Sequence, residues 1–151
     1  MVGWLMVMST FNTFEDLKVW HESRKLVRAV RTVCKRSNVR KDFAFVDQIT
    51  RAARSVSANI AEGCDSLTYP DFIKFLGYAK ASAAEVRSHL FDALDERYIS
   101  KNEFDDLSQQ TKIINRMISK LIHYLQTLDQ KKKRTFSSKK PSTIQPLTNE
   151  L

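Results

Sequence analysis

The feature that most constrains the fold is a long apolar seam in the middle of the chain. From Phe72 to Leu94, apolar residues follow one another at steps of four and three, which is the spacing of one face of an α-helix. Glycine and proline each occur three times in 151 residues, so few residues interrupt helix formation. The chain is therefore expected to consist of long helices.

Similar seams predict three further helices. We expect helices over about 14–37, 43–62, 68–97 and 100–129. Thr68 with Asp71 three residues later, and Ser100 with Glu103, have the pattern of helix N-terminal caps. No alternating strand pattern and no internal repeat competes with this assignment. The predicted fold is all-α, an antiparallel up-down-up-down four-helix bundle with short connections.

The bundle is expected to occupy residues 13–129. Residues 1–12 form a short apolar segment without the basic start of a signal peptide, and we expect a frayed leader. Residues 130–151 begin with KKKR and continue with Ser, Thr, Pro and Lys, which predicts a disordered basic tail. No run of about 18 uncharged apolar residues occurs, so no membrane partner is expected and the location should be cytoplasmic.

The charge of the chain favours an acidic partner. The formal net charge is +8 and the pI is about 9.6, a balance that suits nucleic acid, although a solvated basic face is the ordinary alternative. Trp20 is expected on an apolar stripe, so aromatic residues do not alternate with the cations as they do in many single-strand sites. The predicted nucleic-acid contacts are Arg24, Arg28, Arg31, Arg51, Arg54, Lys131, Lys132, Lys133 and Arg134.

A polar motif ends the second predicted helix, in RAARSVSANIAEG. Asn59, Glu62 and Gly63 belong to it, and Glu85 is expected nearby on the third helix. Two carboxylates can serve acid–base catalysis or bind a metal, but the Glu-x-x-His signature of di-metal bundles is absent. We therefore expect no catalytic residue, no metal and no cofactor.

The same motif has a structural interpretation, which we favour. The Asn59 amide is expected to bond the third helix or Glu85. Glu62 is expected to accept N–H groups of the following turn, or to pair with Arg51 or Lys74. Gly63 is expected to adopt the left-handed conformation that ends many helices. Such bonds would fix the angle between the second and third helices.

Three blocks of sequence resemble a known family. FEDLKVW, QITRAARSVSANIAEG and DFIKFLGYAKASAAEVRSHL resemble the four-helix-bundle proteins encoded in intervening sequences of bacterial 23S rRNA genes. The resemblance covers about Phe14 to Leu128 and implies a non-enzymatic homopentamer. These proteins are similar to the accessory proteins of diversity-generating retroelements, which implies nucleic acid and a reverse transcriptase as partners. Ser57 stands where the family usually has proline, and Arg54 where it usually has an apolar residue.

These observations favour a non-enzymatic, nucleic-acid-binding accessory protein that acts as a basic homo-oligomer, linked to RNA or to an RNA–DNA intermediate. One alternative is a protein-interaction scaffold with incidental charge, such as a reverse-transcriptase partner. Its contacts would be Trp4, Leu5, Tyr69, Phe75 and Tyr78. The other alternative is an enzyme that uses Glu62, Glu85 and His89.

Overall fold

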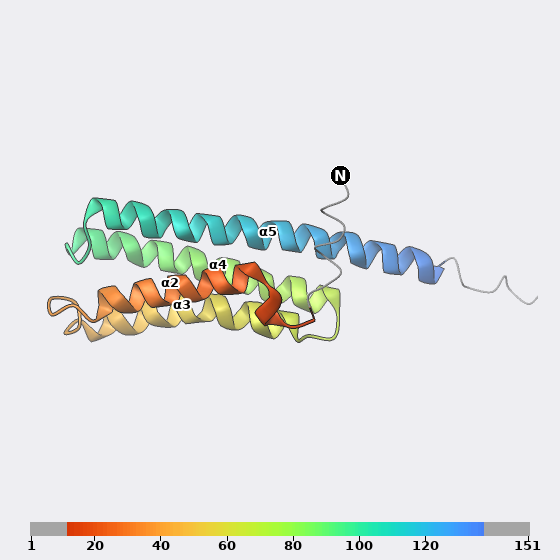
Figure 1. Cartoon of the computed structure of the whole chain (residues 1–151), viewed down its shortest axis with the longest axis horizontal. Helices are drawn as coiled ribbons and strands as arrows, with labels where there is room; N and C mark the ends of the chain where they lie inside the picture. The colour runs from red at the N-terminus through yellow and green to blue at the C-terminus, as the bar shows by residue number, and fades with distance from the viewer. Residues whose placement is uncertain (1–11, 138–151) are drawn as a thin grey trace, which may run out of the picture.

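Four antiparallel helices form a closed bundle in the computed structural model, which describes residues 12–137. Their order is a 3-10 turn η1 (Phe14–Asp16), then α2 (Lys18–Cys34), α3 (Phe43–Cys64), α4 (Tyr69–Asp95) and α5 (Lys101–Ser137). Consecutive helices run in opposite directions (Figure 1). Each helix packs against the next, and α2 also contacts α5. No strand occurs in residues 12–137, and the predicted fold class is confirmed.

The predicted apolar seam forms part of the core. Leu76, Ala79, Ala83 and Val86 on α4 are fully buried. Residues at helical spacing on the other helices face them, among them Leu26 on α2, Ile49 and Ile60 on α3, and Ile114 and Ile118 on α5. Burial of these side chains is the main stabilising contribution. Because every helix has one apolar face, four helices suffice to close a single core.

The capping signals near the third and fourth predicted helices are confirmed. Thr68 Oγ1 accepts a hydrogen bond from the Asp71 amide at 3.1 Å. Ser100 Oγ accepts one from the Glu103 amide at 3.2 Å, and the Glu103 carboxylate accepts one from the Ser100 amide at 2.8 Å. These bonds satisfy backbone donors that would otherwise have no partner at a helix start.

The first helix is shorter than expected. The chain forms the turn η1, extends at Leu17, and begins α2 at Lys18. Leu17 takes the extended values φ −82° and ψ 116°, and its side chain is buried. Tertiary packing therefore interrupts the helix that local propensity favours here. The helix ends at Cys34 instead of Ser37.

The prediction for Gly63 is wrong. The helix α3 continues through Gly63 to Cys64, and no glycine in the described part of the chain has a positive φ. A Cβ atom at Gly63 would lie 2.7 Å from Phe72 Cδ2 and 3.0 Å from Phe75 Cβ. Gly63 is therefore needed for the close approach of α4 to α3. The helix also runs unbroken past Ser57.

The last helix is longer than expected. Residues 130–137 were predicted to belong to a disordered tail, but α5 continues to Ser137. Good helix formers occupy this stretch, and Lys133 pairs with Asp129 one turn earlier at 2.7 Å. The expectations for residues 1–11 and 138–151 lie outside the described residues. Within the described range, no helix has the length and hydropathy required to cross a membrane.

Candidate functional site

A groove between α2 and α3 brings together four of the predicted contact arginines. Its volume is about 620 Å³. We call it the arginine groove, and its lining is Phe14, Trp20, Arg24, Val27, Arg28, Arg31, Arg54, Ser57, Ala58 and Ala61. Arg24, Arg28 and Arg31 share one face of α2 because they are spaced by four and three residues. Arg54 comes from α3 on the other side of the groove.

In the part of the chain that the structure describes, these four arginines have no acidic partners, unlike Arg36 and Arg51. All four are exposed, and within residues 12–137 none of them forms a salt bridge. By contrast, Arg36 pairs with Glu103 at 2.5 Å and Arg51 pairs with Asp47 at 3.4 Å. No carboxylate lines the groove. Its positive potential is therefore not neutralised locally, which favours an anionic ligand.

One end of the arginine groove is aromatic. The Arg24 guanidinium carbon lies 4.9 Å from the centroid of the Trp20 ring, in a cation–π arrangement. Phe14 contacts Trp20 edge to face, with ring centroids 4.9 Å apart. Trp20 packs against the core, as its place on an apolar stripe predicts, but it is only half-buried and also lines the groove beside Arg24. The i, i+4 spacing of Trp20 and Arg24 was the signal for this contact.

The remaining predicted contacts lie outside the arginine groove. Arg51 lines a neighbouring hollow of about 380 Å³, which it shares with Arg54. The four basic residues from Lys131 to Arg134 are exposed on the last turns of α5. Lys132 and Lys133 line a third hollow beside the start of α4. The predicted cations therefore form separate groups. The lining of the arginine groove contains no acidic residue, whereas Asp47 and Asp129 line the other two hollows.

The structure does not assemble the predicted polar constellation. The Asn59 amide donates to Ser55 on its own helix, at 2.8 Å to the carbonyl oxygen and 3.0 Å to Oγ. Ser82 of α4 donates to the same Ser55 Oγ at 2.9 Å. Asn59 therefore reaches α4 through Ser55 and not through Glu85, because a residue one turn away is the nearer acceptor.

In the described residues, neither carboxylate of that motif is a hydrogen-bond partner of the Asn59 amide, which bonds Ser55. Glu62 is exposed, and its expected partners Arg51 and Lys74 pair with Asp47 and Asp71 instead. The Glu85 carboxylate lies 3.7 Å from His89 Nε2, one turn along α4. Both acids lie off the buried faces of their helices, since the apolar residues beside them fill the core.

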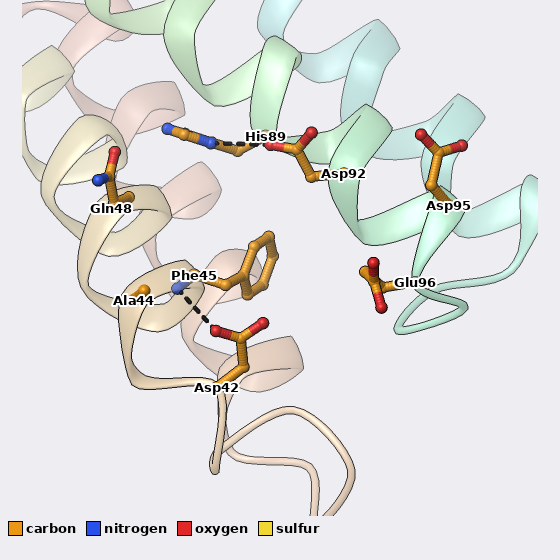
Figure 2. Close-up of a pocket in the computed structure, with 8 residues that line it drawn as sticks. All are labelled: Asp42, Ala44, Phe45, Gln48, His89, Asp92, Asp95 and Glu96. Atoms are coloured by element: carbon orange, nitrogen blue, oxygen red, sulfur yellow. Dashed lines mark hydrogen bonds and ion pairs between the residues drawn. The ribbon is translucent and has the colours of Figure 1, made fainter.

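A hollow of about 470 Å³ with the opposite charge lies between the start of α3 and the end of α4. Asp42, Asp92, Asp95 and Glu96 surround it, together with His89 (Figure 2). Asp42 caps α3 through the Phe45 amide at 3.1 Å and accepts the Tyr98 hydroxyl at 2.8 Å. In residues 12–137, no three His, Cys, Asp or Glu side chains converge as metal ligands. This acidic hollow would repel a polyanion.

The two thiols lack the features of nucleophiles. Cys34 is buried, its Sγ lies 3.8 Å from Thr50 Oγ1, and burial raises the pKa of this thiol. Burial, followed by the charges of Asp65, Glu15 and Asp16, raises the pKa of the half-buried Cys64. A raised pKa keeps both groups in the less reactive thiol form.

Comparisons with known proteins agree on one family. The family model described as 23S rRNA-intervening sequence protein matches residues 15–120. The crystal structure of a protein of unknown function from the S23 ribosomal protein family of Bacteroides thetaiotaomicron is similar, with a TM-score of 0.63 and 28% identity. That match covers 69% of this chain and 97% of the other. No curated protein matches. Since the family model covers most of the chain, the protein belongs to the 23S rRNA-intervening sequence protein family.

Proposed function

We propose that this protein binds nucleic acid through the arginine groove, without catalysing a reaction. The observation that carries the proposal is the set of four exposed arginines along one groove, none with an acidic partner in the described residues. Arginine suits this role because its planar fork donates two hydrogen bonds to a phosphate. Release of counterions from the nucleic acid would supply most of the binding free energy.

The geometry favours contact with the phosphate backbone. Arg24 and Arg31 are seven residues apart on α2, which places their backbones about 10 Å apart along the helix. Side chains spaced in this way can contact neighbouring phosphates of one strand. The groove therefore offers guanidinium groups to a short stretch of backbone, and no carboxylate in its lining would repel the phosphates. The family is named for sequences within 23S rRNA genes, which makes RNA the first ligand to test, in a cytoplasmic setting.

Self-association is part of the proposal. Several large apolar side chains remain exposed on one subunit, including Phe43, Tyr78 and Phe91. Contacts between copies would cover such residues, and an oligomer, expected to be a pentamer, would present several arginine grooves to one nucleic acid. Multivalent contact strengthens binding without any new type of interaction.

The scaffold alternative rests on a different surface. Leu67 is 98% exposed and Phe136 is 78% exposed. Leu67 directly precedes the cap of α4, and Phe136 lines the hollow beside that cap. Of the residues first proposed for partner contacts, Tyr78 is exposed, Tyr69 and Phe75 are half-buried, and Trp4 and Leu5 lie outside the described residues. A protein partner would bind here, on α4 and α5, and leave the arginine groove free.

A binding titration at several salt concentrations tests the proposed function. We expect the full chain to retain a labelled 30-nucleotide RNA on a filter at 50 mM salt, and its affinity to fall steeply by 200 mM. Double-stranded DNA of matched charge is measured in parallel. No retention of either ligand at 50 mM salt would overturn the proposed function and favour the scaffold alternative.

A further inference from the structure

The aromatic end of the arginine groove differs from the rest of it. Phe14, Trp20 and Arg24 meet there, whereas Arg28, Arg31 and Arg54 continue the groove as cations alone. Phosphate contact requires no aromatic ring. Phe14 and Trp20 also pack against the core, but the surface that they expose to the groove can accept a planar group beside the cations.

Resting on the proposed function, we propose that the arginine groove binds unpaired nucleotides, with one base stacked at the Trp20–Arg24 pair. The guanidinium of Arg24 lies 4.9 Å from the Trp20 ring centroid, and this cation–π contact holds it in place. Bases stack on guanidinium planes and on aromatic rings in many single-strand sites. Phe14 supports Trp20 from the side through its edge-to-face contact.

The size and lining of the groove agree with this ligand. A volume of about 620 Å³ lies within the range of sites that enclose a small planar ligand. Across the groove, Ser57, Ala58 and Ala61 of α3 are small, which leaves room for a base. The cations from Arg28 to Arg31 then meet the phosphates that follow it. In a duplex the bases are stacked inside, so a duplex offers this end of the groove phosphates alone.

Fluorescence of Trp20 provides a direct readout. The chain has two tryptophans, Trp4 and Trp20, so the full-length variant Trp4→Phe reports on Trp20 alone. The ligands are a 12-nucleotide unpaired RNA of CA repeats, its DNA equivalent, the 12-base-pair RNA duplex and inorganic polyphosphate. We expect strong quenching by both single strands, and a much smaller change with the duplex or with polyphosphate at equal saturation.

Arg24→Lys separates stacking from charge. This substitution keeps the cation but removes the planar guanidinium. We expect it to weaken single-strand binding at least fivefold and duplex binding less than twofold. Arg116→Lys, at an exposed position on α5, is the matched control and should change neither affinity by more than twofold.

Each outcome separates this inference from the proposed function. Equal quenching by RNA and polyphosphate, or equal weakening of single-strand and duplex binding by Arg24→Lys, would overturn the base-stacking site and leave phosphate binding intact. Failure of all four ligands to bind would overturn both.

Discussion

At the scale of single residues, Gly63 is a position where one added methyl group would disturb the packing of α4 against α3. We expect Gly63→Ala to destabilise the protein by about 2 kcal/mol, because the new Cβ would lie 2.7 Å from a ring carbon of Phe72. Gly77 provides the control, since a Cβ there meets no atom within 4 Å. Gly77→Ala should stabilise α4 by about 0.5–1 kcal/mol. Urea unfolding of both variants measures the two changes, and equal effects would contradict this account of Gly63.

Glu103 makes stability depend on pH. The Arg36 guanidinium, with the Ser100 amide and hydroxyl, lowers the pKa of Glu103 from 4.5 to about 2. A carboxyl whose folded pKa is depressed stabilises the fold above its unfolded pKa, and this stabilisation is lost as the pH falls from about 4.5 to about 2. Since both side chains are more than a third exposed, solvent screening reduces the effect to about 1 kcal/mol.

Glu103→Gln tests this dependence. The amide oxygen of glutamine keeps an acceptor for the Ser100 amide but carries no charge for Arg36. We expect the variant to be about 1 kcal/mol less stable than the parent at pH 7 and equal to it near pH 2. Urea unfolding across this range measures the difference, and a constant deficit at all pH values would mean that charge is not its cause.

At the scale of elements, local signals predicted the helices well and their ends less well. The caps at Thr68 and Ser100 were predictable because every atom involved lies within three residues. Gly63 was misassigned because its role depends on Phe72 and Phe75, which are on another helix. The late start of α2 depends on burial of Leu17 in the core. Such tertiary contacts are invisible to a local pattern.

The candidate site, like the helices, was predictable only where it depends on local spacing. The spacing of Arg24, Arg28 and Arg31 placed them on one face of a helix from the sequence alone. The position of Arg54 opposite them depends on how α2 and α3 pack. Asp47, which lines the neighbouring hollow with Arg54, pairs with Arg51 instead. The expected grouping of Asn59, Glu62 and Glu85 failed for the same reason.

The end of α5 is expected to be dispensable for folding. Residues 130–136 are exposed, so a chain that stops after Gln130 should melt within about 2 °C of the full chain. Removal of Lys131 to Arg134 should weaken single-strand and duplex RNA binding by the same factor, because these cations would contact phosphates alone. Thermal melting followed by circular dichroism, with filter binding, measures both. A large loss of stability would show that α5 supports the bundle beyond Asp129.

At the scale of the whole molecule, charge is unevenly distributed. The arginine groove between α2 and α3 has no acidic lining, whereas the hollow between α3 and α4 has four carboxylates (Figure 2). The charges that give the net value of +8 are therefore not distributed evenly over the bundle surface. Under the proposed function, this separation would attract a polyanion to the arginine groove and repel it from the acidic hollow.

The proposed oligomer is a prediction at this scale. We expect light scattering after size exclusion to give a mass of five times the 17.5 kDa of one chain at micromolar concentration. Contacts between copies would involve exposed apolar residues such as Tyr78 and Phe91, so Tyr78→Asp should lower the mass. A parent protein that elutes as a monomer at all concentrations tested would contradict the proposal that an oligomer presents several arginine grooves to one nucleic acid.

The most direct test of the central claim compares two triple variants with equal loss of charge. One is Arg28→Gln, Arg31→Gln and Arg54→Gln in the groove. The other is Lys112→Gln, Arg116→Gln and Lys120→Gln, at exposed positions on α5. Binding of a 30-nucleotide RNA is measured by fluorescence anisotropy from 50 to 200 mM salt, with helix content checked by circular dichroism.

We predict that the groove variant loses at least tenfold in affinity and that its salt slope falls by about 2, as expected for three lost phosphate contacts on a single strand. The α5 variant should stay within threefold of the parent. Equal losses in the two folded variants would contradict the assignment of binding to the arginine groove.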